Sequence, residues 1–156
     1  MQDAHSCPTP MAVGTKLFVG DSELFKKPSL YRSTIGALQY LTLTRANISF
    51  TVNKLSQFLQ APTEFKWQAC KHVLRYIKGT SFHGFLFKPA ASLCVECYAD
   101  ADWGSNLDDR RSTRRYCMYL GPNLVQWSSR KQKVVALSST EAKYRALAQT
   151  TTGMAE

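Results

Sequence analysis

The sequence lacks any long apolar run. No stretch of about 18 consecutive apolar residues occurs, so we expect no membrane-spanning helix. Residues 1–18 also lack the basic stretch followed by an apolar one that is typical of a signal peptide. Disorder is excluded as well, because 44% of the 156 residues are hydrophobic and 12% are aromatic, which is enough for a packed core. The length suits one domain or slightly more.

The number of cysteines is odd, so the cysteines cannot all be paired in disulfides within one chain. Five cysteines without a secretion signal favour free thiols in a reducing, intracellular compartment, cytoplasmic or nuclear. The pair Cys94 and Cys97 has the spacing of half a zinc site, but a structural site needs four ligands and no second such pair follows. The alternative is that both are ordinary thiols of a strand.

Acidic residues are absent from residues 110–133, which contain seven basic ones. These are Arg110, Arg111, Arg114, Arg115, Arg130, Lys131 and Lys133. The formal charge of the whole chain is +9. Such a basic region beside acidic residues suggests a polyanion held near a metal site. The alternative is a solvated basic surface with no nucleic-acid role.

Helical spacing of apolar residues dominates the first half of the chain after an aperiodic start. Residues 1–27 have no clear period and predict an irregular lead-in, either a loop or a frayed end. Three helices are predicted from there to Gly79, over residues 28–43, 46–60 and 64–79. Thr63 is a candidate cap for the third helix, and Gly79 ends it.

After Gly79 the apolar residues recur at every second position, which is the spacing of a strand. Strands are predicted over residues 82–88, 93–99, 112–121 and 123–129, with the last two joined as a hairpin. A helix over 138–149 follows, which Ser138, Ser139 or Thr140 can cap. We therefore divide the chain into an irregular lead-in (1–27), a helical segment (28–80) and an α+β or α/β domain (81–156).

Two carboxylates stand where the second of these strands ends, in "CYADADW" (97–103). Residues two apart on a strand face the same side, so Asp100 and Asp102 converge if the strand continues. Converging carboxylates repel unless a cation such as Mg²⁺ neutralises them. A two-metal site needs further acids, and Asp108, Asp109 and Glu141 are the candidates. The alternative for Asp108 and Asp109 is a polar loop with local ion pairs.

Several ordered motifs in residues 98–149 are similar to the ribonuclease H region of copia-type retrotransposon Pol polyproteins. They are "YADADW" (98–103), "DDRRST" (108–113), "WSSRKQ" (127–132) and "SSTEA" (138–142). Residues 30–80, "LYRSTIGALQYL…RYIKGT", resemble the helical segment that connects the reverse transcriptase to that domain. The resemblance covers about residues 28–150, nearly the whole chain.

The resemblance implies a fold and an activity. The fold would be a helical connection segment followed by a partial ribonuclease H-like domain, with an antiparallel three-strand meander and its first helix. The family activity is Mg²⁺-dependent hydrolysis of the RNA strand in an RNA–DNA hybrid. Asp100 matches the family's first catalytic aspartate and candidate Mg²⁺ ligand, with Asp102 as its neighbour. Arg130, Lys131 and Lys133, together with Arg114 and Arg115, would lie near the nucleic acid.

Three departures from the family pattern bear on catalysis. The family's helix begins Glu-Ala-Glu-Tyr, whereas here it reads Glu141-Ala142-Lys143-Tyr144. In one register Lys143 occupies the position of the catalytic glutamate, and in the other Glu141 is the ligand. The family's next catalytic aspartate would lie beyond Glu156, as would the strand that carries it, and the upstream polymerase domains are missing from this chain. Finally, Arg114 and Arg115 stand where the family usually has Ser-Gly.

Three hypotheses about function follow. The first is a truncated polyprotein fragment that resembles an endoribonuclease but does not cleave hybrids. The second is a basic module that binds nucleic acid without cleavage. The third is an active enzyme that takes its missing acids from a second chain.

Overall fold

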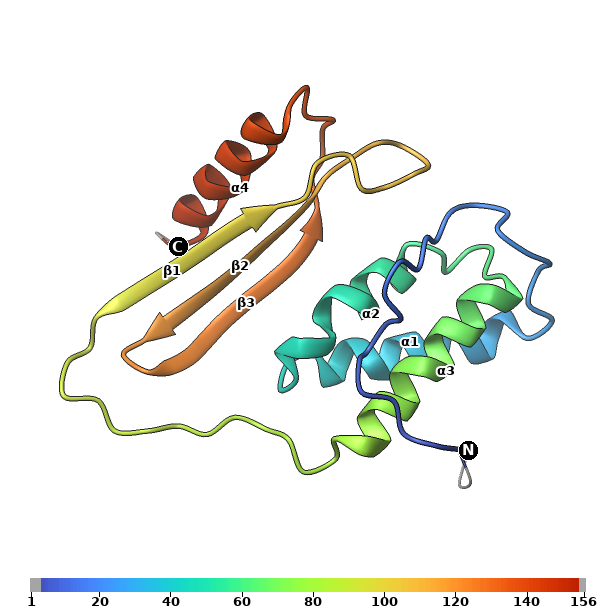
Figure 1. Cartoon of the computed structure of the whole chain (residues 1–156), viewed down its shortest axis with the longest axis horizontal. Coiled ribbons are helices and arrows are strands. Elements are labelled where there is room, and N and C mark those ends of the chain that lie inside the picture. The colour runs from blue at the N-terminus through green and yellow to red at the C-terminus, as the bar shows by residue number, and fades with distance from the viewer. Residues whose placement is uncertain (1–3, 155–156) are drawn as a thin grey trace. The chain divides into compact units, whose positions relative to one another are not determined.

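A computed structural model describes residues 4–154, and it has the mixed α+β composition that the sequence predicts. The chain divides into two compact units, a helical unit up to Gly84 and a sheet unit from Phe85. The elements in chain order are α1 (Pro28–Leu41), the short 3₁₀ helix η1 (Ala46–Ile48), α2 (Ser49–Ser56), α3 (Glu64–Gly79), β1 (Val95–Ala101), β2 (Thr113–Leu120), β3 (Asn123–Lys131) and α4 (Ser139–Met154) (Figure 1).

The predicted helices α1 and α3 are confirmed. Pro28 stands in the first turn of α1, where its missing N–H has no helical partner to lose. The Thr63 side chain accepts a hydrogen bond from the N–H of Lys66, so it caps α3 as expected. The predicted helix over 46–60 is wrong in part, because residues 46–48 form a 3₁₀ turn and the α-helix ends at Ser56. There the Ser56 hydroxyl donates to the Asn53 carbonyl, an alternative to regular helix bonding.

The helical unit has a core of eleven buried residues drawn from all its helices and from the lead-in. They are Leu17, Tyr31, Ile35, Leu38, Ile48, Val52, Leu55, Phe58, Cys70, Val73 and Tyr76. The Tyr31 hydroxyl donates to the Leu55 carbonyl at 2.9 Å, which links α1 to α2. Burial raises the pKa of the Cys70 thiol to about 12, so this cysteine is held as a neutral thiol.

Residues 4–25 form no helix, yet they are not frayed. They run antiparallel to α3 as a strap (Figure 1), and the carbonyls of Ala4, Thr9 and Phe18 contact Lys78, His72 and Lys66 in turn. At the end of the strap the ring of Phe25 stacks on Trp67 at 4.8 Å between centroids. The strap therefore covers part of the core, to which it contributes Leu17.

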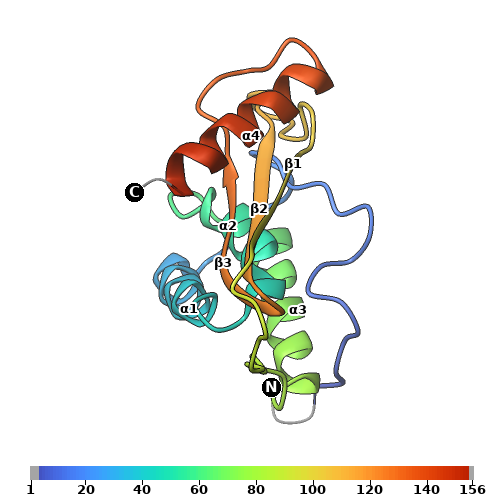
Figure 2. The same ribbon diagram turned by 90° about the vertical axis from the view of Figure 1, so that its left-hand side faces the viewer.

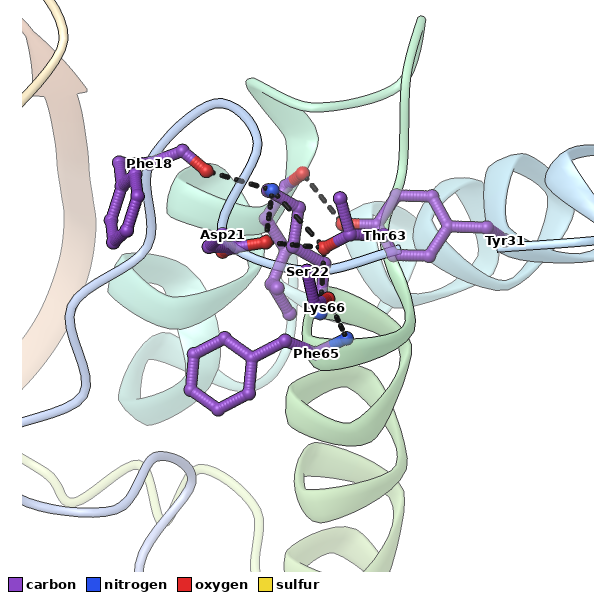
Figure 3. Close-up of polar contacts among 8 residues, drawn as sticks. Phe18, Asp21, Ser22, Tyr31, Thr63, Phe65 and Lys66 are labelled. Carbon is purple, nitrogen blue, oxygen red and sulfur yellow. Dashed lines mark hydrogen bonds and ion pairs between the residues drawn. The ribbon is translucent and has the colours of Figure 1, made fainter. Parts of the chain in front are cut away.

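The ammonium group of Lys66 fastens the strap to α3. Its Nζ lies 2.8 Å from Asp21 Oδ1 and 2.9 Å from the Phe18 carbonyl, and both charged side chains are at most 2% exposed. Figure 3 shows Asp21, Thr63 and Lys66 pointing toward one another, with Thr63 Oγ1 3.2 Å from the ammonium. The Phe58 ring lies 4.4 Å below the same nitrogen. A buried charge needs such partners, so this cluster fixes the path of the strap.

The sheet unit is a three-strand antiparallel meander in the order β1-β2-β3, with α4 against one face (Figure 2). Ala101 is buried in a cluster with Ala136, Ala142 and Ala146, so α4 packs on the sheet through alanines. The predicted strand over 93–99 begins and ends two residues later, at Val95 and Ala101. The helix predicted over 138–149 is confirmed, and it extends to Met154.

The predicted strand over residues 82–88 is wrong. The segment is irregular, and Phe82, Leu86 and Phe87 are exposed, so no alternating face is buried that would favour a strand. The side-chain amide of Asn123 bonds both the N–H and the carbonyl of Lys88, which are the groups that a neighbouring strand would otherwise pair. Phe85 packs on Trp127 at 4.8 Å between ring centroids.

Candidate functional site

Asp100 lies one residue before the end of β1, and its side chain is 63% exposed. Its Oδ1 is 3.9 Å from the Nζ of Lys143 on α4, which is exposed to a similar degree. Solvent screens an exposed pair of this kind, so it adds little to stability. The pair matters because it shows which residue of α4 lies next to the Asp100 carboxylate, and that residue is a lysine.

Asp102 follows β1 and has a different environment. Its Oδ1 accepts the N–H of Thr113 at 2.5 Å, and its Oδ2 lies 3.4 Å from the guanidinium of Arg115. Because β1 ends at Ala101, the strand does not continue, and the two aspartates make separate contacts. Asp102 thus ties the start of β2 to the end of β1.

Glu141 is engaged at the beginning of α4. Its Oε2 accepts the N–H of Leu137 at 2.7 Å, and its Oε1 lies 2.7 Å from Arg145 Nη2. The backbone N–H of Leu137, and then the Arg145 guanidinium, lower the pKa of this carboxyl below its ordinary value. Of the capping residues predicted for this helix, Ser138 is the one whose hydroxyl accepts the N–H of Glu141.

The loop that contains Asp108 and Asp109 folds on its own polar groups. The Asn106 side chain accepts the N–H groups of both aspartates, and Asp109 Oδ2 lies 2.8 Å from Lys131 Nζ. Burial alone would raise the pKa of Asp109, but the hydrogen bonds from Lys131 and from the Arg111 N–H lower it overall. The predicted local ion pair is confirmed at Asp109, whose Oδ2 lies 3.7 Å from Arg111 Nε, whereas the pair with Lys131 joins residues 22 positions apart.

The side chains that hold this loop and the start of α4 were not predicted. The indole N–H of Trp103 donates to the Ala136 carbonyl at 2.9 Å, and the buried amide of Gln132 donates to the Ala142 carbonyl at 2.8 Å. Ser112, fully buried, accepts the N–H of Gly104. A buried glutamine or serine inside a polar stretch has no distinct sequence pattern, so only the fold reveals these roles.

The predicted basic residues divide between the two faces of the sheet. Arg114 pairs with Ala101 in the ladder, so it lies on the face that α4 covers, and Arg130 lies opposite it on the same face. Arg115 and Lys131 lie on the other face, and each contacts an aspartate, Asp102 or Asp109. Lys133 is exposed just beyond β3.

The described residues contain no group of three or more histidines, cysteines or acids arranged to hold a metal ion. All five cysteines are free, with Cys94 exposed and Cys97 half-buried on β1. Among residues 4–154, no helix combines the length and the apolar character needed to cross a membrane.

These observations define the chain as an α+β protein whose aspartate-bearing edge strand meets the first turns of a helix. It is 46% identical over 154 residues to the retrovirus-related Pol polyprotein from transposon RE1 of Arabidopsis thaliana, and 45% identical over 150 residues to that of transposon RE2. These alignments cover 99% and 96% of this chain, but the chain spans only about a tenth of either polyprotein.

A shorter relative is matched over most of its own length. The chain is 43% identical over 122 residues to the secreted RxLR effector protein 161 of Plasmopara viticola, and this covers 78% of the chain and 86% of that protein. The chain is homologous over nearly its whole length to retrovirus-related Pol polyproteins of transposons, and it belongs to one family with this shorter relative. The predicted relationship to retrotransposon polyproteins is thereby confirmed. No family model and no solved structure matches the chain.

Proposed function

We propose that the sheet unit is a partial ribonuclease H-like element of a copia-type polyprotein, that the helical unit is its connection to the reverse transcriptase, and that the chain does not cleave RNA–DNA hybrids. The observation that carries the proposal is the ammonium of Lys143, 3.9 Å from the carboxylate of Asp100. A dication bound by Asp100 would have to displace this ammonium or tolerate its repulsion. One exposed carboxylate beside a cation therefore does not fit Mg²⁺.

The position of Glu141 supports the register in which Lys143 replaces the catalytic glutamate. Two residues of an α-helix are about 200° apart around its axis, so Glu141 and Lys143 cannot both face β1. Lys143 is the one that approaches Asp100, while Glu141 is bonded to Leu137 and Arg145. Both carboxylate oxygens of Glu141 are therefore occupied, one by Leu137 just before α4 and the other by Arg145 one turn further along it.

A cleavage assay tests the loss of catalysis. The purified chain is incubated with an RNA–DNA hybrid in Mg²⁺ and in Mn²⁺, and we expect no product above a buffer control. The matched variant is Asp100→Asn, which removes the candidate ligand and keeps the shape. Metal-dependent cleavage by the wild-type chain that disappears in Asp100→Asn would show that the site is active, and our proposal would be wrong.

A second candidate function is binding of nucleic acid without cleavage. It is favoured by the basic residues Arg114, Arg115, Arg130, Lys131 and Lys133 around the end of the meander. Phosphate contacts release counterions, so the logarithm of affinity for B-DNA should fall with the logarithm of salt at about −0.9 per contact. Fluorescence anisotropy of a labelled hybrid and a labelled DNA duplex, each measured over a series of salt concentrations, gives this slope. An affinity that does not change with salt would reject the candidate.

A further inference from the structure

Two arginines lie directly opposite each other where β2 and β3 pair. Arg114 and Arg130 are partners in the antiparallel ladder, and Ala101 of β1 continues the same row. Directly opposed residues of antiparallel strands project to one face with Cβ atoms about 5 Å apart. Since Ala101 is buried under α4, both guanidinium groups extend from the face on which α4 lies.

No acidic side chain neutralises this row. In the described part of the chain, neither Arg114 nor Arg130 takes part in an ion pair. Their sequence neighbours differ, because Arg115 lies 3.4 Å from Asp102 and Lys131 lies 2.8 Å from Asp109, both on the opposite face. In the ladder Arg115 stands opposite Ser129 and Lys131 opposite Thr113, so each of these rows has one basic residue with an acidic partner. The row of Arg114 and Arg130 has two basic residues and, among the described residues, no acidic partner.

Opposed like charges on neighbouring strands destabilise a sheet. An anion placed between them removes the repulsion, and guanidinium groups suit an oxyanion because each offers two parallel N–H donors. Along the two strands, the next residues on this face are Tyr116 and Ser128, themselves a ladder pair. Their hydroxyl groups give the row neutral donors rather than competing carboxylates.

We infer that Arg114 and Arg130 together form a binding site for one phosphate group of a nucleic-acid backbone. This inference rests on the proposed binding of nucleic acid. It goes further, because it assigns the phosphate contact to two of the five basic residues named above. Arg115 and Lys131 hold the loop and the strand ends through their aspartates, and they do not bind phosphate.

The first test compares two double variants of equal charge. Arg114→Gln/Arg130→Gln and Arg115→Gln/Lys131→Gln each remove two positive charges from the same two strands. For a labelled DNA duplex we expect at least a tenfold loss of affinity in the first variant and a change below about threefold in the second. The salt slope of the first should become shallower by about 0.9, the value for one phosphate. Equal losses in the two variants, or none in the first, overturn the site.

The second test needs no nucleic acid. Thermal unfolding is followed in increasing inorganic phosphate, with chloride adjusted to keep the ionic strength constant. We expect phosphate to raise the Tm of the wild-type chain and of Arg115→Gln/Lys131→Gln, and to leave that of Arg114→Gln/Arg130→Gln unchanged. Equal phosphate shifts in all three proteins overturn the site.

The two tests together separate this inference from the function on which it rests. Duplex binding that survives in Arg114→Gln/Arg130→Gln overturns the arginine site alone and leaves the proposed nucleic-acid function standing. A phosphate-dependent Tm without any binding of duplex, hybrid or single strand overturns the assignment to nucleic acid and that function with it.

Discussion

The buried ammonium of Lys66 shows how much one residue of this chain can determine. It lies on α3, yet three of its contacts fix the strap and the cap, through Phe18, Asp21 and Thr63. Its side chain is 0% exposed, so removing either charge of the pair leaves the other buried in a poorly solvating interior. The strap is therefore held both by this charge pair and by its apolar residues, of which Leu17 is buried in the core.

Lys66→Met is expected to destabilise the helical unit by about 3–5 kcal/mol, because it leaves the Asp21 carboxylate buried without its partner. Lys66→Met combined with Asp21→Asn should cost less than the two single changes added together. Urea unfolding followed by circular dichroism measures these differences. Lys71→Met, on the same helix but partly exposed, is the control and should change stability by about 0.5 kcal/mol or less. A Lys66→Met chain as stable as the control would contradict the role of the pair.

Residue roles could be predicted from the sequence only where a local pattern carried them. The cap at Thr63, the end of α3 at Gly79 and the ion pair of Asp109 with Arg111 follow from local chemistry, and the structure bears them out. The pairing of Lys66 with Asp21 joins residues 45 positions apart, and the lead-in has no period that would place it. Such contacts depend on the tertiary path of the chain, which local propensity does not encode.

Among the elements, α4 is the one whose start bears directly on the candidate site. The Ser138 hydroxyl accepts the N–H of Glu141 at 3.1 Å, while Glu141 accepts that of Leu137. The Ser138 hydroxyl satisfies one of the amide groups that the helix leaves unpaired, and the Glu141 carboxylate bonds the chain just before the helix. Together they fix where α4 begins. The position of Lys143 beside Asp100 follows from that start, because a shift by one residue would turn Lys143 about 100° away.

Ser138→Ala should therefore cost about 0.5–2 kcal/mol, the usual range for the loss of a capping hydroxyl. Ser139→Ala is the matched control, since Ser139 is the first residue of the helix and is exposed. Thermal unfolding monitored by circular dichroism compares the two. An equal loss in Ser139→Ala would mean that the cap has been assigned to the wrong serine.

The helices and strands were easier to predict from the sequence than the segments that pair with each strand. Helices α1 and α3 are long and periodic, and β2 and β3 are joined by a recognisable turn, so all four occur where the pattern places them. Residues 82–88 have an equally good alternating pattern, but Asn123 occupies the backbone groups of Lys88 through its side chain. Alternating apolar residues indicate that a segment can form a strand. The segment forms one only where a neighbouring strand has backbone groups available to pair with it.

The two units of the molecule differ sharply in what they bury. The helical unit has a cluster of eleven residues that includes large apolar and aromatic side chains, whereas the buried cluster described for the sheet unit consists of four alanines. A buried leucine or phenylalanine contributes about 1.5–3 kcal/mol, and an alanine much less. The two units should therefore differ in their resistance to denaturant.

We expect the sheet unit to unfold at a lower urea concentration than the helical unit. In Trp67→Phe the remaining tryptophans, Trp103 and Trp127, both belong to the sheet unit, so fluorescence reports on that unit alone. Circular dichroism at 222 nm reports mainly on the helices, three of which are in the helical unit. The fluorescence transition should come first. Coincident transitions by both probes would show instead that the chain unfolds as one cooperative body.

The strap has a consequence for how the helical unit forms during protein synthesis. Its contacts with α3 join positions 41 to 74 residues apart, from Glu64 with Glu23 to Lys78 with Ala4. A ribosome makes the strap before α3, so the strap has nothing to close on until α3 has left the exit tunnel. Until then Leu17 and Phe25 remain uncovered, and folding of the helical unit waits for its last helix rather than growing outward from its first.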